Sequence, residues 1–331
     1  MTFADRIKAW VAWFQRHRTL SLALQAVAAV VFLGFLVWAV RGTWREAGDR
    51  LRDANPLDFG IACIGLAAYY LLFVVGWMRI LGAWGIRMPY PAALRAEMVS
   101  MLAKYIPGGV WTPAARVVAA RRAGVTDAAL VTASMLVEAG LSAVAGIVVF
   151  VISLAWMDDV NAPLAPLLAF GVLVSALLHP RIFQPLAARV VRKLGYPPLP
   201  PLPMTTMLFL LVFYSFTWLV GGAALLFLIR SVGGNPGPES IAFLGGVAAV
   251  GAIVAVLAVF APSGLGVREA SMYGLLLAVA SPAAALGATV LNRIAITVVE
   301  IALLVVGAFF LRGRDQEAEV RLTESEHAGR A

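Results

Sequence analysis

The sequence predicts an all-α polytopic membrane protein, and three observations carry that prediction. The 331-residue chain is 61% hydrophobic and only 13% charged, with a mean hydropathy of +0.88. Soluble domains are about 45–50% apolar and about 25% charged, so a soluble core of this size could not hold so much apolar surface. The apolar residues also form long runs, and a helix needs about 20 of them to cross a bilayer. We therefore expect about eight hydrophobic segments in a membrane.

The expected segments follow one another along the chain with short polar links. Residues 1–18 carry four Lys/Arg beside Trp and Phe, which is typical of a cytoplasmic amphipathic helix on the membrane surface. The flippase-like transmembrane domain is expected over 19–311, and the mixed charges of residues 312–331 predict a disordered cytoplasmic tail. The predicted spans are residues 19–40, 58–82, 128–156, 163–179, 205–230 and 283–311.

The positions of the basic residues predict the orientation. With both termini inside, the cytoplasmic side holds 18 Lys and Arg, and the outer side holds four, all in residues 41–56. Cytoplasmic loops of membrane proteins carry an excess of Lys and Arg. We therefore expect a multi-pass protein of the cytoplasmic membrane with both termini in the cytoplasm. The net charge of +8 belongs to these loops, so we expect no nucleic-acid partner.

Two Pro/Gly breaks interrupt the apolar sequence. The first is Lys104-Tyr-Ile-Pro-Gly-Gly-Val-Trp-Thr-Pro113, and the second is Ala261-Pro-Ser-Gly-Leu-Gly-Val-Arg-Glu269. Broken helices at corresponding places in two halves of a membrane protein point to a substrate site. Non-helical backbone at membrane depth is tolerated where it is buried in protein or lines a watery cavity. The breaks are therefore the candidate site.

A weak internal similarity relates the two breaks. A shift of 155 residues places Pro107 on Pro262 and Gly109 on Gly264. Such a shift fits inverted repeats over about 58–156 and 205–311, a common plan among transporters. Each break would then be the tip of a re-entrant hairpin. The sequence leaves a second interpretation open, in which residues 240–281 form two ordinary short spans.

Two charges fall deep inside predicted spans. Glu138 lies about 15 Å into its span at about 1.5 Å per residue, and Arg293 lies about as deep from the other side. An unpaired charge at the bilayer centre costs at least about 2.5–3.5 kcal/mol. We therefore predict that Glu138 and Arg293 pair near the midplane, as a static link between the halves or as a gate, or that both face a polar cavity.

The cations that flank the breaks suit an anionic phosphate group. Free backbone N–H groups beside Lys and Arg bind phosphate, which suggests Lys104, Arg116 and Arg268. Trp111, inside the first break, would line the cavity or anchor the chain at the interface. The expected substrate-binding residues are Lys104, Pro107, Gly108, Gly109, Trp111, Arg116, Pro262, Gly264 and Arg268.

The sequence gives little sign of enzyme chemistry. Its histidines, His17, His179 and His327, stand far apart, so we expect no metal site. It contains no G-x-S-x-G and no phosphate-binding P-loop, so we expect no cofactor. The single Cys63 lies in an apolar run and has no second cysteine with which to form a disulfide.

The two breaks and their surroundings resemble a known family. Lys104-Tyr-Ile-Pro-Gly-Gly-Val-Trp111 with Glu138, and Pro262-Ser-Gly-Leu-Gly-Val-Arg-Glu269 with Asn292-Arg293, are similar to two signatures of the lysylphosphatidylglycerol synthase transmembrane region. The resemblance implies a flippase-like fold that moves an anionic lipid, of the phosphatidylglycerol or polyprenyl-phosphate type, across a bacterial or archaeal cytoplasmic membrane. The sequence shows no soluble synthase domain of the kind found in that family, so we do not expect it to transfer an aminoacyl group to a lipid.

Two other functions remain open at this stage. The chain could be a non-catalytic membrane partner of a lipid-modifying enzyme or glycosyltransferase. It could also be an intramembrane enzyme that acts on lipid head groups. Head-group turnover by the isolated protein would favour the enzyme, whereas activity that needs a second protein would favour the partner.

Overall fold

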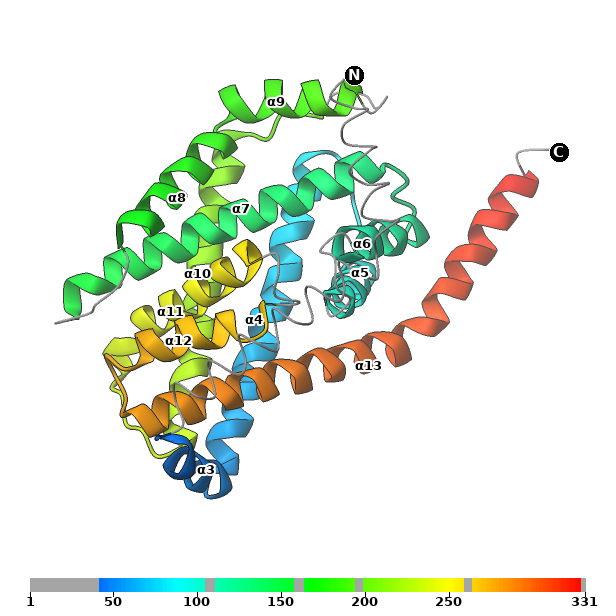
Figure 1. The fold of residues 1–331 in the computed structure, drawn as a ribbon. Helices are drawn as coiled ribbons and strands as arrows, with labels where there is room; N and C mark the ends of the chain where they lie inside the picture. Colours follow the sequence, from blue (N-terminus) through cyan, green and yellow to red (C-terminus); the bar gives the residue numbers. More distant parts are fainter. Residues whose placement is uncertain (1–41, 105–110, 158–163, 194–198, 259–263, 329–331) are drawn as a thin grey trace, which may run out of the picture.

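The computed structural model describes residues 42–104, 111–157, 164–193, 199–258 and 264–328, and within these ranges every regular element is a helix (Figure 1). The predicted all-α fold is therefore confirmed. Residues 1–18 and the first predicted span, 19–40, lie outside the described residues. Five described segments are long and apolar enough to cross a membrane: Pro56–Ala83, Ala128–Trp156, Met204–Ser231, Pro238–Leu257 and Pro282–Gly307.

The elements differ widely in length, and short helices stand on both sides of each break. Their bounds are α3 Trp44–Arg52, α4 Pro56–Ala83, α5 Tyr90–Ala103, α6 Trp111–Arg122, α7 Ala128–Ser153, η1 Leu154–Trp156, α8 Leu164–Leu178, α9 Pro180–Lys193, α10 Met204–Ser231, η2 Pro238–Ser240, α11 Ile241–Leu257, α12 Val267–Leu276 and α13 Pro282–Ala328.

Polar residues just before the long helices determine where these helices begin. The Asn55 side chain accepts a hydrogen bond from Leu57 N at 2.9 Å, and Pro56 occupies the first position of α4. Asp127 caps α7 in the same way, through Leu130 N at 3.0 Å. Such caps satisfy backbone N–H groups that have no partner inside the helix. Two of the membrane helices thus start at positions that the sequence encodes locally.

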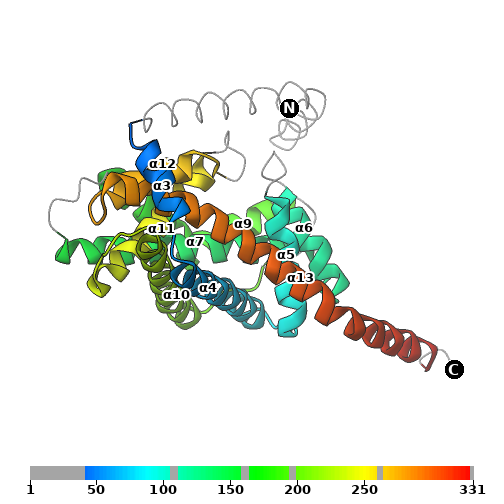
Figure 2. The same ribbon diagram turned by 90° about the horizontal axis from the view of Figure 1, so that it is seen from below.

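Helices α4 and α10 pack antiparallel through small residues. Gly65 of α4 lies against Ala224 of α10, and further along α4 Gly76 lies against the ring of Tyr214. Small residues allow close helix approach where lipid supplies no hydrophobic drive for association. Figure 2 shows the two helices side by side, and they form the most extensive helix pair of the fold. They run in opposite directions between the two faces of the membrane.

The first break joins a hairpin of two short helices, α5 and α6, which we call the first hairpin. The two helices pack against each other, and α5 also packs on α13. The hairpin starts after α4 and ends before α7, at the end of the molecule opposite α3 (Figure 1). At 14 and 12 residues, these helices are about 21 and 18 Å long, too short to cross a bilayer core of about 30 Å.

The second break joins helix α11 to helix α12, and we call this pair of helices the second hairpin. Helix α12 has 10 residues, about 15 Å, so it cannot be an ordinary span. The re-entrant hairpin over residues 240–281 stays a prediction, because Pro238–Leu257 is by itself long and apolar enough to cross a membrane. Helix α13 begins at the α3 end, where Leu286 packs with Ala47, so the second hairpin returns to the end at which α10 finishes. The two hairpins enter from opposite ends.

Both halves of the chain repeat one order of elements. A long helix, two short helices and a second long helix follow one another as α4 to α7, and again as α10 to α13 with α11 and α12 as the short pair. The first long helices of the two sets, α4 and α10, are antiparallel. This order agrees with the proposed inverted repeat over about 58–156 and 205–311, which stays a prediction.

Three expected segments differ from the structure. Helix α8 ends at Leu178 after 15 residues, shorter than the predicted span 163–179, because Pro180 cannot continue the preceding hydrogen-bond pattern. The basic link that follows forms the helix α9. The tail that we expected to be disordered continues α13 as a helix to Ala328, since its Glu, Arg, Ala and Gln residues favour helix.

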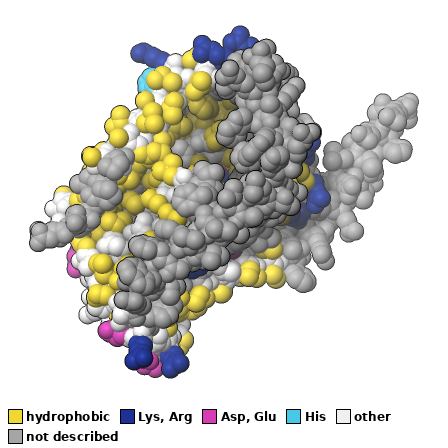
Figure 3. Space-filling view, in the orientation of Figure 1, with side chains coloured by type: hydrophobic (Ala, Val, Ile, Leu, Met, Phe, Trp, Pro, Cys, Tyr) yellow, Lys and Arg dark blue, Asp and Glu magenta, His cyan; other side chains and the backbone are white. Residues whose placement is uncertain are grey.

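One face of the molecule shows the layering that a membrane protein requires. Hydrophobic side chains cover the left part of its middle, and Lys and Arg stand at its upper and lower ends and also at its right edge (Figure 3). In Figure 1 the upper end is where α9 lies and the lower end is where α3 lies. Such an arrangement suits an apolar belt in hydrocarbon between two polar surfaces.

Candidate functional site

A sealed cluster of three charges lies between the first hairpin and α7. Arg116 of α6 donates from Nη1 to Glu138 Oε2 of α7 at 2.7 Å, and its Nη2 forms an ion pair with Glu97 Oε1 of α5. Its Nε donates to Ser100 Oγ at 3.1 Å. The Arg116 side chain is only 3% exposed. We call Glu97, Arg116 and Glu138 the buried triad.

Aromatic side chains enclose the buried triad. The guanidinium of Arg116 lies over the Trp77 ring, with its Cζ 4.9 Å from the ring centroid. Trp77 Nε1 in turn donates to Ser134 Oγ at 2.8 Å, which fixes the indole. The Tyr214 hydroxyl lies 3.5 Å from Glu138 Oε1. Arg116, predicted to hold a phosphate, thus has its cationic head occupied by two carboxylates and an aromatic face.

The predicted pairing of Glu138 with Arg293 is wrong. Glu138 pairs with Arg116, and Arg293 Nη1 of α13 lies 3.4 Å from Glu269 Oε1 of α12. The prediction matched the depths of the two residues along their helices, and depth does not specify the direction in which a side chain points. In each half the charge on the long helix pairs instead with the hairpin that precedes that helix.

A second cluster forms where the first hairpin meets α13. Lys104, at the end of α5, forms an ion pair with Glu300 of α13. Glu300 Oε1 also accepts a hydrogen bond from the Tyr70 hydroxyl of α4 at 2.5 Å. Glu300 therefore lies beside Lys104, a predicted substrate residue. Lys104 keeps 23% of its side chain exposed.

Two more cations join this cluster, Arg268 from the second hairpin and Arg293 from α13. Arg268 and Arg293 lie within electrostatic reach of Lys104, and Arg268 also reaches Tyr69 and Tyr70. The Nε atom of Arg268 is buried and has no hydrogen-bond partner among the residues that the structure describes. We call this group of charged residues beside the two breaks the tip cluster. Its members are Lys104, Arg268, Arg293, Glu269 and Glu300.

Glycine geometry shapes the tip of the second hairpin. Gly264 and Gly266 have φ values of +65° and +83°, a region that side chains with a Cβ seldom occupy. Gly264 also lies directly against Ala255 of α11, so a Cβ would collide there. Gly266 N donates to Glu269 Oε2 at 2.6 Å, and the same carboxylate holds Arg293 through its other oxygen.

The remaining predicted site residues fall into two groups. Pro107, Gly108, Gly109 and Pro262 lie outside the described residues. Trp111 is the first residue of α6, with 38% of its surface exposed. Its position at the mouth of the first hairpin fits both roles suggested by the sequence, cavity lining and interfacial anchoring.

Sequence reasoning singled out neither Glu97 nor Tyr70. The available signal for Glu97 was an acidic residue in a largely apolar segment, since such residues face the protein interior and mark functional pathways. Tyr70 carried no signal, because a tyrosine near the end of a predicted span reads as part of an aromatic belt.

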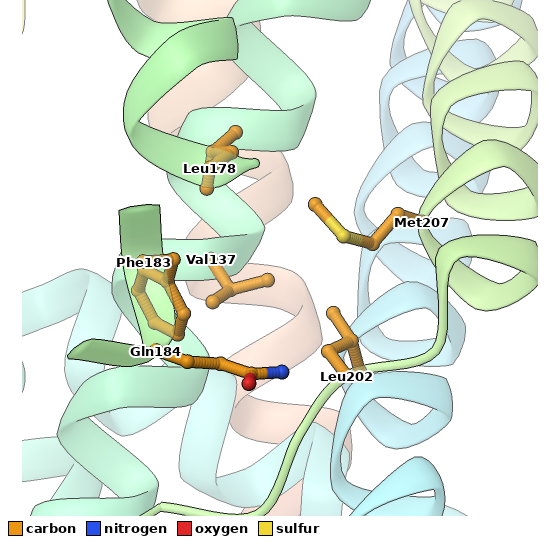
Figure 4. Close-up of a pocket in the computed structure, with 6 residues that line it drawn as sticks. All are labelled: Val137, Leu178, Phe183, Gln184, Leu202 and Met207. Carbon is orange, nitrogen blue, oxygen red and sulfur yellow. The ribbon is translucent and has the colours of Figure 1, made fainter. Parts of the chain in front are cut away.

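Other candidate sites in the described residues are weaker. No group of three or more His, Cys, Asp or Glu that could hold a metal is found there. A pocket between α7, α9 and the start of α10 is apolar except for one amide (Figure 4), and offers no charge to an anionic ligand. Its lining residues are Val137, Leu178, Phe183, Gln184, Leu202 and Met207.

Comparison with known proteins bears on both clusters. A search of curated proteins found no match to this chain. The family model described as the lysylphosphatidylglycerol synthase TM region matches residues 25–305, a range that includes both hairpins, the buried triad and the tip cluster. The resemblance carried by the two Pro/Gly breaks is therefore confirmed over most of the sequence. The chain is a multi-pass membrane protein that belongs to the lysylphosphatidylglycerol synthase TM region family.

Proposed function

We propose that the protein moves an anionic lipid, of the phosphatidylglycerol or polyprenyl-phosphate type, between the two leaflets of the cytoplasmic membrane. The observation that carries this proposal is the buried Nε of Arg268, without a hydrogen-bond partner in the described residues, at the meeting point of the two hairpins. A buried donor without a partner is costly. A phosphate oxygen from a lipid head group would satisfy it.

The charges of the tip cluster support an anionic ligand. Three cations, Lys104, Arg268 and Arg293, face two carboxylates, so the ionised cluster carries one excess positive charge. Excess charge in a low-dielectric site is stabilised by a counter-charge that binds there. The guanidinium fork of Arg268 matches the spacing of two phosphate oxygens, which makes charge-assisted hydrogen bonds the expected mode of binding.

The hairpins suggest how a head group would cross while its acyl chains stay in lipid. Each hairpin would bring a helix break into the membrane from one face, and the charged residues that flank the breaks, Lys104 and Arg268, lie within electrostatic reach of each other. A head group moving from one tip to the other would have backbone N–H groups and cations available along its path. Exposed apolar side chains on the surrounding helices would contact the acyl chains.

The proposal also covers the orientation of the chain in the membrane, its need for cofactors and its partners. The loop charges predict both termini in the cytoplasm, and a lipid translocase of this kind needs neither a cofactor nor a metal. Aminoacyl transfer to the lipid is not expected of the chain. Membrane lipids with anionic head groups are its expected partners, together with a lipid-modifying enzyme or glycosyltransferase that would supply or use the translocated lipid.

Lipid transfer in proteoliposomes tests the proposal. We would measure transfer of fluorescent phosphatidylglycerol and of a labelled polyprenyl phosphate for the wild type and for Arg268→Gln. A hydrogen bond to a charged group contributes about 1.5–3 kcal/mol, so the variant should transfer the accepted lipid about 10–100 times more slowly. Arg121→Gln is the matched control, because Arg121 is an exposed cation at the far end of the first hairpin.

Each outcome has a definite meaning. Transfer of one lipid by the wild type and by Arg121→Gln, but not by Arg268→Gln, would support a translocase and identify its head-group class. Equal rates in the two variants would remove Arg268 from the path. A folded wild-type protein that transfers neither lipid would refute the proposal and favour the partner-subunit interpretation, which co-purification with a lipid-modifying enzyme would then support.

A further inference from the structure

The buried triad poses a charge problem that the proposed function leaves unanswered. Two carboxylates, Glu97 and Glu138, share one guanidinium, and the three side chains are 1%, 6% and 3% exposed. If all three are ionised, one negative charge stays uncompensated in a dry, low-dielectric environment. Burying such a charge is so costly that a carboxyl group takes up a proton instead. The triad therefore calls for a bound proton.

The hydrogen bonds indicate which carboxylate holds that proton. Glu138 accepts from Arg116 Nη1 and lies near the Tyr214 hydroxyl, and both donors favour its ionised form. Glu97 forms an ion pair through Oε1, whereas its Oε2 is buried and has no hydrogen-bond partner in the described structure. A vacant, buried carboxylate oxygen is the position where a proton can be added without breaking a contact.

Glu97 is also connected to the proposed lipid site. It lies on α5 two helical turns before Lys104, and the two side chains interact electrostatically. The charged and titratable groups around Glu97, taken from every packed element, are Arg116 on α6, Glu138 on α7, Tyr214 on α10, Tyr69 on α4, Glu300 on α13 and Lys104 after its own helix. Among these, Lys104 belongs to the tip cluster and to the same re-entrant helix.

We propose that Glu97 Oε2 binds a proton that the protein moves together with the anionic lipid. This inference rests on the proposed function and adds its energy source. A proton from water adds to the Glu97 carboxylate on one side of the membrane and returns to water on the other side. With the proton bound, the triad is neutral and Lys104 and Arg268 can hold the phosphate.

Loss of the proton from Glu97 weakens the binding of the phosphate. The triad then carries a negative charge near Lys104, which repels the phosphate and favours its release. Binding of the proton and binding of the lipid anion are therefore linked, and each strengthens the other. One proton with one singly charged lipid also makes transfer electroneutral, so the membrane potential does not oppose it.

A pH gradient across proteoliposomes tests the coupling. With one proton per lipid, a gradient of one pH unit should drive labelled lipid to about a tenfold excess in the leaflet on the alkaline side, since the lipid ratio at equilibrium is the inverse of the proton ratio. Pyranine inside the vesicles reports the proton flux. Glu97→Gln should bring the ratio to about one, whereas Glu239→Gln, an exposed acid in η2, should keep it near ten.

The failure of the inference can be told apart from the failure of the proposed function. Wild-type transfer with a ratio of one would overturn proton coupling and leave translocation standing. Absence of transfer by the wild type would overturn both. A full ratio in Glu97→Gln would remove Glu97 from the proton path.

A spectroscopic measurement covers the case in which Glu97→Gln cannot transport. Infrared difference spectra of the wild type should contain the band of a protonated carboxyl group, and Glu97→Gln should lose it. Persistence of the band in Glu97→Gln would place the proton elsewhere and refute the assignment.

Discussion

Replacing Arg116 by methionine tests whether the buried triad is held together by charge. Methionine keeps much of the length of the arginine stem and removes the guanidinium, so both Glu97 and Glu138 lose their cation. Breaking a buried ion pair by removing one partner costs about 3–5 kcal/mol, because the remaining charge stays in a low-dielectric interior. With 3% of the Arg116 side chain exposed, little water can enter to reduce that cost.

Thermal unfolding in detergent measures this cost. At roughly 2 °C per kcal/mol for a chain of this size, Arg116→Met should lower the apparent melting temperature by roughly 6–10 °C. Intrinsic tryptophan fluorescence is a convenient probe, since Trp77 lies against the guanidinium and reports the site directly. The same preparation should be assayed for lipid transfer at a temperature where the variant is folded.

The same substitution in a chain without the two carboxylates separates the electrostatic part of the stability loss from the packing part. In a chain that carries Glu97→Gln and Glu138→Gln, Arg116 is itself a buried cation without a carboxylate partner, so Arg116→Met should leave the stability unchanged or raise it. An equal loss in both backgrounds would refute the charge argument and attribute the role of Arg116 to its contact with Trp77. A fall in melting temperature of less than about 2 °C in the wild-type background would mean that Arg116 is hydrated.

Two further predictions concern the packing around the clusters. Tyr70→Phe removes a buried hydrogen bond to Glu300, so we expect a loss of about 1.5–3 kcal/mol in unfolding free energy, measured by chemical denaturation, and slower lipid transfer. Gly246→Ala places a methyl group against Phe150, where α11 meets α7, so we expect a loss of about 1–3 kcal/mol in the same assay; an unchanged midpoint for either variant would contradict the corresponding contact.

Much of the fold could be predicted from the sequence because lipid restricts the choices. An apolar run as long as Pro56–Ala83 or Met204–Ser231 has to be a membrane helix, since only a helix satisfies its own backbone there. The breaks were equally clear, because proline and glycine interrupt that pattern. The end of α8 and the helical tail were less predictable, since short helices and charged segments depend on local context rather than on hydrocarbon.

The candidate site was predictable in its location and not in its contacts. Lys104 and Arg268 could be identified because they flank the breaks, and the structure brings both to the tip cluster. The partners of Glu138 and Arg293 could not be identified, because two spans of equal depth leave the rotation of each helix undetermined. Glu97 was missed because its helix, α5, does not cross the membrane, so its acidic residue did not seem anomalous.

The two observed ion pairs, Glu138 with Arg116 and Arg293 with Glu269, extend the similarity between the two halves. The shift of 155 residues that aligns the two breaks also places Glu138 on Arg293. Each of these residues pairs with the second helix of its own hairpin, Glu138 with Arg116 and Arg293 with Glu269. Both halves thus attach a hairpin to the following long helix by an ion pair, with the signs exchanged.

The two attachments differ in exposure, and under the proposed function this difference would give the two halves different roles. In the first half the paired side chains are 3% and 6% exposed, whereas in the second half they are 21% and 18% exposed. The first hairpin is therefore held by a dry pair whose excess charge suits a proton. The second hairpin is held by a wetter and weaker pair beside Arg268, where an incoming phosphate can compete for Arg293. An inverted repeat can in this way supply one site for a proton and one for an anion from the same arrangement of helices.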